Sequence, residues 1–81
     1  MDKIAQAVLV VVNGILVKNG KAELSPADLA SRNIDGLGFD SMDKLELVME
    51  LEDQLDMLFD NAGLLRCRTL QELVQFIGRI K

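Results

Sequence analysis

Residues 41–56 carry the feature that most limits the fold of this chain: an apolar pattern with helical spacing, uninterrupted by Gly or Pro. Asp40, directly before the segment, is a candidate N-cap, because its carboxylate can accept a hydrogen bond from the first turn. Lys44 can lay its stem on the core and keep its amine in water. On a helical wheel, one arc gathers the side chains expected in the core, which are Leu47, Val48, Leu51 and Leu55.

Residues 3–18 form a second segment with helical periodicity. Asp2 is a candidate cap for its start, and Asn19-Gly20 is typical of a helix end. The β-branched run at 10–12 is also compatible with a strand. The side chains expected to face the core are Ile4, Val8, Val11, Val12, Ile15 and Leu16.

Residues 70–80 predict the last helix, and the stretch from Thr69 to Glu72 has the spacing of a capping box. Residues 57–65, before it, are expected to form one short helical turn, with Gly63 as a breaker. The core stripe predicted for the last helix consists of Leu70, Leu73, Val74, Ile77 and Ile80.

The connection at 19–39 is rich in turn residues and is expected to be a long loop. Ser25-Pro26 is typical of a helix start, so a single helical turn is predicted at 26–31. Apolar residues spaced along the loop should pack on the core: Leu24, Leu29, Ile34, Leu37 and Phe39. The pattern as a whole predicts one all-α domain over residues 1–81, folded as a small helical bundle.

Composition excludes several functions. The 81 residues contain no His and one Cys, which removes His-dependent acid–base and triad catalysis and the usual zinc sites, so we do not expect an enzyme. A single Cys cannot form an internal disulfide and favours the reducing cytoplasm. The formal net charge of −4 disfavours nucleic acid and anionic membranes and favours a basic protein surface as the partner.

Neither a leader nor a membrane span is expected. Asn13 and Gly14 split the apolar stretch near the N-terminus, and no cleavage site of small residues follows. The longest unbroken apolar run, Ala7 to Val12, has six residues and is far too short to cross a membrane.

The segment at 41–56 has a second apolar arc, formed by Met42, Leu45 and Met49, roughly opposite the first. This arc can be scattered surface residues, or a stripe that another helix covers. It can also be a docking surface, with apolar anchors at its centre and charge that attracts a basic partner. The acids around it are Asp43, Glu46, Glu50, Glu52 and Asp53.

Ser41 stands where the loop enters this helix. Capping of the helix start is the simpler role, because Asp and Ser are common there. The second role is an attachment point, because a phosphodiester on this hydroxyl would lie near the free N–H groups of the first turn. No base is evident near Ser41 in the sequence, so another protein would have to modify it.

The stretch from Leu37 to Glu52, with Leu-Gly-Phe-Asp-Ser-Met at its start, closely resembles the 4′-phosphopantetheine attachment motif of acyl carrier proteins. The length, the acidity, the long loop and the Thr-capped last helix extend this resemblance over the whole chain. The resemblance implies a four-helix bundle with three main helices and a short third one. It also implies that a phosphopantetheinyl transferase attaches the cofactor from coenzyme A to Ser41.

The family pattern implies further roles. Asp40 matches the acid that helps to place the transferase and its metal, and the thiol of the attached arm carries cargo as a thioester. The carrier would be a monomer. Its partners would be loading ligases and downstream synthases or transferases that have basic docking patches. The positions matching acidic docking residues are Asp43, Glu46, Glu52 and Asp53, and those matching apolar contacts are Met42, Leu45 and Met49.

Some residues depart from the family pattern. Met42 stands where Leu is common, Lys44 is basic within an acidic helix, and Arg66 and Arg68 place positive charge in the third-helix region. Cys67 between the arginines is compatible with a half-buried, inert thiol or, if exposed, with one whose pKa they lower.

The cargo stays open. The first expectation is a fatty or other lipid acyl chain, in a fatty acid or specialised biosynthetic pathway. The second is aminoacyl or polyketide-type cargo, which would need a dedicated loading ligase. An unmodified docking module that uses the helix at 41–56 is the alternative of a different class.

Overall fold

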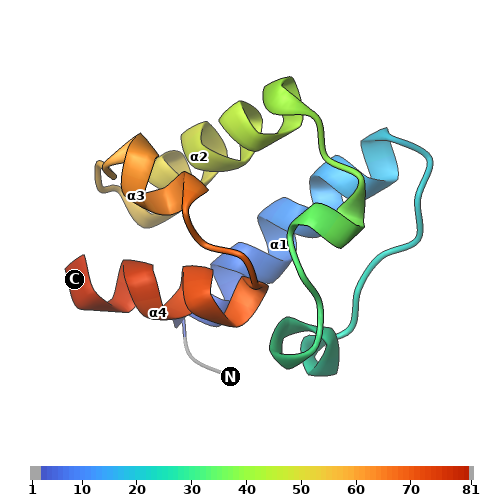
Figure 1. The fold of residues 1–81 in the computed structure, drawn as a ribbon, viewed down its shortest axis with the longest axis horizontal. Helices are drawn as coiled ribbons and strands as arrows, with labels where there is room; N and C mark the ends of the chain where they lie inside the picture. Colours follow the sequence, from blue (N-terminus) through green and yellow to red (C-terminus); the bar gives the residue numbers. More distant parts are fainter. Residues whose placement is uncertain (1–2, 81) are drawn as a thin grey trace.

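The computed structural model describes residues 3–80, and it confirms the predicted all-α fold with three long helices and one short one (Figure 1). The predicted cap Asp2 lies outside the described residues. Two short 3₁₀ turns, η1 and η2, interrupt the long first connection. The elements are α1 (Lys3–Lys18), η1 (Pro26–Ala30), η2 (Asp35–Leu37), α2 (Ser41–Leu55), α3 (Asn61–Leu65) and α4 (Leu70–Ile80).

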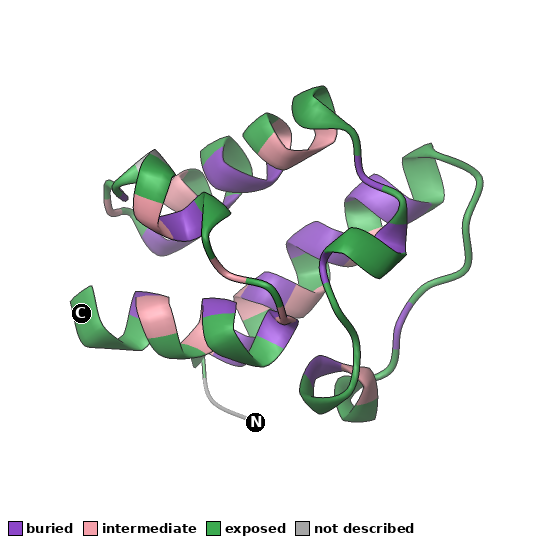
Figure 2. Cartoon of the chain, viewed as in Figure 1, coloured by how far each residue is buried: buried purple, intermediate pink, exposed green. Residues whose placement is uncertain are grey.

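The core lies between α1, α2 and α4, and purple, buried positions line the inner side of each helix in Figure 2. The core side chains predicted for α2 are all buried, as are five of the six predicted for α1; Ile4 is half-buried. In α4, Leu70, Leu73 and Ile77 are buried and Val74 is half-buried. The prediction was wrong for Ile80, which is 45% exposed because it ends α4 at the edge of the molecule.

The long loop packs on the core as predicted, because all five of its spaced apolar residues are buried. Asn13 of α1 holds it: its side-chain amide donates to the Leu24 carbonyl at 3.1 Å and accepts from the Leu24 N–H at 2.7 Å. The turn predicted at 26–31 is the 3₁₀ turn η1, and η2 is a further turn that the sequence did not indicate. The loop also meets the start of α4, where the Ile34 N–H donates to the Arg68 carbonyl at 2.8 Å.

Gly63 does not break a helix, contrary to the sequence-based expectation, but lies inside α3. The Asp60 carboxylate accepts from the Ala62 N–H at 3.2 Å and starts this helix. A Cβ on Gly63 would lie 2.9 Å from two ring atoms of Phe76 in α4. The glycine is therefore needed because α3 approaches α4 closely at this point.

The ends of the other helices differ slightly from prediction. Helix α2 ends at Leu55, and Asp56 adopts a left-handed conformation with φ of 52°. At the start of α4, Thr69 Oγ1 accepts from the Glu72 N–H at 3.0 Å, but the Glu72 carboxylate accepts from the N–H of Arg68. Only half of the predicted capping box therefore forms.

Among residues 3–80, no helix has the length and apolar character that a membrane crossing needs.

Leu51→Ala is expected to lower the free energy of unfolding by about 2–5 kcal/mol, because Leu51 is fully buried and the change leaves a cavity. Met49→Ala, on the exposed side of the same helix, should change it by no more than about 0.5 kcal/mol. Denaturant unfolding of both variants measures the difference. A loss below about 1 kcal/mol for Leu51→Ala would contradict the assigned core face.

Candidate functional site

The start of α2 is fixed by a reciprocal cap between Asp40 and Asp43. The Asp43 N–H donates to Asp40 Oδ1 at 2.8 Å, and the Asp40 N–H donates to Asp43 Oδ2 at 3.3 Å. Asp40 is thus the predicted N-cap, and Ser41 becomes the first residue of the helix, with its side chain exposed. Within the described chain, no hydrogen bond engages the N–H groups of Ser41 and Met42, which are free for an anionic group.

The loop residues directly before Ser41 are held by contacts with Lys21 and with the core. Gly38 has a φ of 74°, in the left-handed region that favours glycine. The Lys21 side chain occupies the space that a Cβ on Gly38 would need, and its Nζ donates to the Leu37 carbonyl at 2.7 Å. Phe39 is buried in the core. Ser41 is therefore presented by a fixed segment.

An apolar groove of about 430 Å³ opens beside Ser41, between α2 and the end of α3. Its lining residues are Ser41, Lys44, Leu45, Val48 and Leu65. Val48 was expected in the core, and Leu65 was not singled out because the pattern at 57–65 predicts a short turn but not which residue faces α2. Leu45, predicted as a docking residue, thus lines this groove as well.

The second apolar arc of α2 is exposed, as the docking interpretation requires. Met42 is 71% exposed and Met49 is 59% exposed, and no helix of the described chain covers them. Leu58, in the turn before α3, is 83% exposed and extends this surface beyond the residues that the sequence indicated. Met49 and Leu58 line a shallow, open groove together with Glu52, Asp53, Asp56 and Met57.

Three of the four acids expected to dock partners are already engaged within the chain. Glu46 pairs with Lys18 of α1 at 2.6 Å, Asp43 accepts from the Asn19 amide at 3.0 Å, and Glu52 accepts from the Phe59 N–H at 3.0 Å. The hydrogen bond to Glu46 raises the pKa of Lys18. Asp53 is exposed and has no hydrogen bond or ion pair within the described chain.

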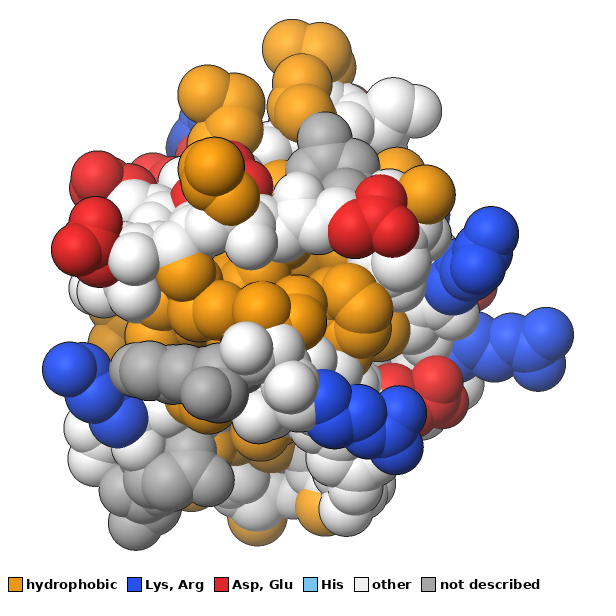
Figure 3. All heavy atoms as spheres, turned by 90° about the vertical axis from the view of Figure 1, so that its left-hand side faces the viewer, with side chains coloured by type: hydrophobic (Ala, Val, Ile, Leu, Met, Phe, Trp, Pro, Cys, Tyr) orange, Lys and Arg blue, Asp and Glu red, His pale blue; other side chains and the backbone are white. Residues whose placement is uncertain are grey.

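The acids without a hydrogen bond or ion pair in the described chain lie toward the end of α2. Glu50 and Asp53 are exposed in its C-terminal half, and Asp56 is exposed directly after it. Figure 3 shows the side of the molecule where α3 and the end of α4 lie: apolar side chains cross its centre, and charged side chains of both signs surround them. An apolar centre with a charged rim is the composition of a protein-binding surface.

Cys67 is half-buried between α3 and α4. Its Sγ lies 3.8 Å from the Gly63 carbonyl. Burial raises the pKa of the thiol, and the negative charge of Glu72 raises it further. The half-buried, inert thiol is therefore the better interpretation, because Cys67 lacks the exposure on which a lowered pKa depended.

No group of three or more potential metal ligands occurs among the described residues. The site thus consists of an exposed hydroxyl at a helix start, two free N–H groups, an apolar groove and an exposed apolar surface with acids beside it. Such a set can hold and present a covalently attached group.

Comparison with known proteins also indicates a protein that carries a covalently attached group. Residues 20–77 match the family model described as phosphopantetheine attachment site. The acyl carrier protein of Onion yellows phytoplasma is 32% identical over 68 residues, which cover 84% of this chain and 90% of that protein. The acyl carrier protein of Aster yellows witches'-broom phytoplasma is 38% identical over 57 residues, which cover 70% and 75%.

The acyl carrier protein of Campylobacter concisus is 28% identical over 69 residues, or 85% of this chain and 90% of that protein. No solved structure matches the chain with statistical significance. The chain belongs to the acyl carrier protein family, whose members bear a phosphopantetheine attachment site, and it is a carrier protein with 4′-phosphopantetheine as its cofactor. The start of α2 fits this cofactor, because the free N–H groups suit its phosphate and the groove suits an apolar cargo.

Cys67 is expected to react more slowly with iodoacetamide than an ordinary thiol, because a raised pKa leaves less thiolate at neutral pH. Its rate should keep rising with pH beyond about 8.5, where an ordinary thiol begins to level off. Alkylation of the unmodified protein, followed by mass spectrometry, measures this rate, and the same chain unfolded in urea is the control. Equal rates in the folded and unfolded chains at neutral pH would contradict the prediction.

Proposed function

We propose that Ser41 is the residue that receives 4′-phosphopantetheine. The supporting observation is its hydroxyl, which is exposed at the first position of α2, with two unengaged N–H groups beside it and an apolar groove next to it. The N–H groups and the dipole at the start of α2 stabilise the negative charge of a phosphodiester on this oxygen.

Asp40 serves both the fold and the modification in this proposal. One carboxylate oxygen caps α2 through the N–H of Asp43, and the second has no hydrogen bond in the described chain. The second oxygen is available to the metal ion of a transferase. The transferase would bind coenzyme A next to that metal ion. Attachment would form a phosphodiester between the serine oxygen and the phosphopantetheine phosphate. The pyrophosphate bond of coenzyme A would break, adenosine 3′,5′-bisphosphate would leave, and the serine proton would pass to a base of the transferase.

The attached arm supplies a terminal thiol, on which acyl cargo is held as a thioester. We propose acyl chains of fatty acid or lipid biosynthesis as the cargo, because Leu45, Val48 and Leu65 give the groove apolar walls that suit an alkyl chain. Aminoacyl or polyketide-type cargo has no comparable support in the groove.

We propose that partner enzymes dock on the exposed side of α2. Met42, Leu45 and Met49 are the apolar contacts, and Asp53 is the acid best placed to meet a basic partner because it is free of internal contacts. Asp43, Glu46 and Glu52 contribute charge while they also hold the fold. The partners are the transferase, a loading ligase and downstream acyl-handling enzymes.

A single carrier domain over residues 1–81, monomeric and active in the cytoplasm, completes the proposal. One cluster of buried residues joins all four helices, which supports a single domain. The lone Cys suits a reducing compartment. Presentation of one exposed helix to several partners favours a monomer.

Incubation with coenzyme A and a broad-specificity phosphopantetheinyl transferase should add one phosphopantetheine to the parent chain and none to Ser41→Ala, because the variant lacks the accepting oxygen. Intact mass measures the gain. Ser31→Ala, which removes another exposed hydroxyl, is the matched control and should be modified like the parent. A gain in Ser41→Ala, or no gain in a parent chain that starts unmodified, would contradict the proposal and favour the non-covalent docking module.

Reversal of Asp53 to Lys should slow modification by the same transferase roughly threefold to tenfold at low salt, because it removes attraction to a basic surface. The loss should shrink as salt rises. Glu46→Lys should slow the reaction too, and it should also lower the Tm because it opposes Lys18. Glu23→Lys, an exposed acid in the long loop, is the control of equal charge change. Equal kcat/KM values for Asp53→Lys and Glu23→Lys would show that the docking surface is misplaced.

A further inference from the structure

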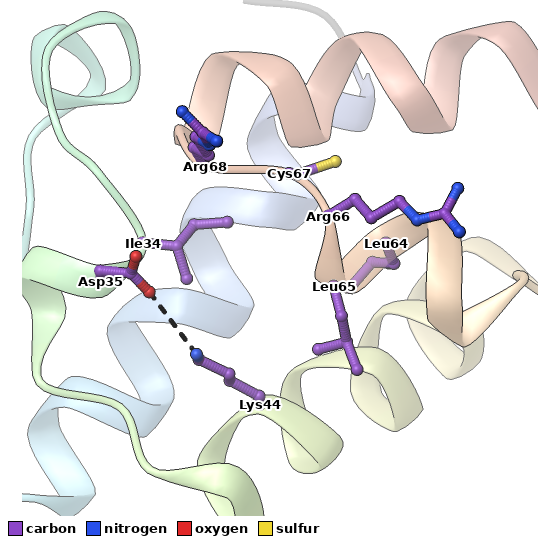
Figure 4. A pocket seen from close by; sticks show the side chains of 8 residues that line it. All are labelled: Ile34, Asp35, Lys44, Leu64, Leu65, Arg66, Cys67 and Arg68. Carbon is purple, nitrogen blue, oxygen red and sulfur yellow. Dashed lines mark ion pairs between the residues drawn. The ribbon is translucent and has the colours of Figure 1, made fainter.

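A second cavity of about 210 Å³ lies beside this groove, and Figure 4 shows it from close by. Lys44 and Leu65 line both spaces, so these two side chains form the partition between them. In Figure 4, Leu65 extends from the end of α3 toward α2, and the Lys44 side chain extends from α2 toward Asp35. The second cavity is lined by Ile34, Asp35, Lys44, Leu64, Leu65, Arg66, Cys67 and Arg68.

A single ion pair positions the Lys44 half of this partition. Lys44 Nζ lies 3.5 Å from Asp35 Oδ1, in the 3₁₀ turn η2 on the other side of the cavity. Asp35 has no other side-chain contact, and its side chain is 83% exposed. The side chains of Arg66 and Arg68 point away from Lys44 in Figure 4 and do not compete for Asp35. The ion pair with Asp35 is therefore the one polar contact of Lys44 Nζ within the described chain.

The two spaces differ in chemistry. Between Ser41 and the partition, an alkyl chain meets Leu45, Val48 and the apolar stem of Lys44. At the partition it meets the ammonium of Lys44 and the carboxylate of Asp35. Further entry would strip water from these charges or separate them, which opposes insertion of an alkyl chain. An exposed ion pair adds little stability by itself, so substitution of either partner should leave the fold intact.

We propose that the Lys44–Asp35 pair sets the length of acyl cargo that the protein shelters. Short and medium chains fill the groove as far as the pair. Longer chains leave their ends in water, because the ion pair closes the way to the second cavity. The inference rests on the proposed attachment at Ser41 and adds a determinant of cargo length to it.

The test uses the complete chain loaded with butanoyl, octanoyl, dodecanoyl or hexadecanoyl phosphopantetheine, with loading verified by intact mass. The readout is the gain in Tm over the unacylated form, because a chain that packs in the native state stabilises it. Lys44→Ala removes the partition, and Asp35→Asn releases Lys44 without changing the groove wall. Lys18→Ala, which breaks the ion pair with Glu46 outside the groove, is the control.

In the parent, the gain in Tm should rise with chain length and then stop rising at a medium chain. In Lys44→Ala and Asp35→Asn it should continue to rise through hexadecanoyl, whereas Lys18→Ala should keep the limit of the parent. A gain that rises without limit in the parent, or an unchanged limit in both Lys44→Ala and Asp35→Asn, would overturn the proposal.

Two other outcomes are distinguishable from these. If Lys44→Ala fails to fold, Asp35→Asn decides alone, because it changes only an exposed side chain. If intact mass shows that the parent chain accepts no phosphopantetheine, the proposed function itself is wrong, and the inference about cargo length is wrong with it.

Discussion

Helix α2 has two apolar sides, but the described chain packs against only one of them. Leu47 and Leu51 are buried in the core with α1, and this burial fixes the rotation of α2 about its axis. Met42 and Met49 are turned to solvent as a consequence. A shift of the helix by one residue would rotate every side chain by about 100° and would turn Leu47 and Leu51 out of the core. The cap formed by Asp40 and Asp43 stabilises the helix start that this arrangement requires.

Some acids of α2 hold the fold together, and others have no hydrogen bond or ion pair. Asp43 and Glu46 join α2 to the end of α1 through Asn19 and Lys18, and Glu52 binds the Phe59 N–H. Glu50 and Asp53 in α2, and Asp56 directly after it, have no hydrogen bond or ion pair among residues 3–80. The side chains free to attract a basic protein therefore lie away from Ser41, whereas Lys44, near Ser41, is basic. A partner that docks along α2 meets the uncompensated charge at the C-terminal half of the helix.

The long elements and the start of α2 could be predicted from the sequence because they depend on local signals. Helical periodicity located α1, α2 and α4, and the Asp-Ser pair located the start of α2. Beyond the local errors at Thr69 and Ile80, what the sequence missed involves contacts between distant segments. Gly63 appeared to be a breaker because its packing on Phe76 of α4 has no local signal. The pairing of Lys18 with Glu46 joins residues 28 positions apart, and no spacing rule for a single helix could reveal it.

The contrast between local and distant signals also applies to the proposed site: the attachment motif is local, whereas the residues proposed to bind cargo come from distant segments. The residues proposed to accept the cofactor, Asp40 and Ser41, are adjacent in the chain, so the attachment motif is legible in any sequence that preserves it. The groove takes one wall from α2 and another from Leu65, and its far end depends on Asp35 in the long loop. A change in the groove walls alters residues that also pack in the fold or face partners, whereas either half of the Lys44–Asp35 pair can change without disturbing the core. If this pair sets cargo length as proposed, a single exposed substitution is the shortest route from one cargo length to another.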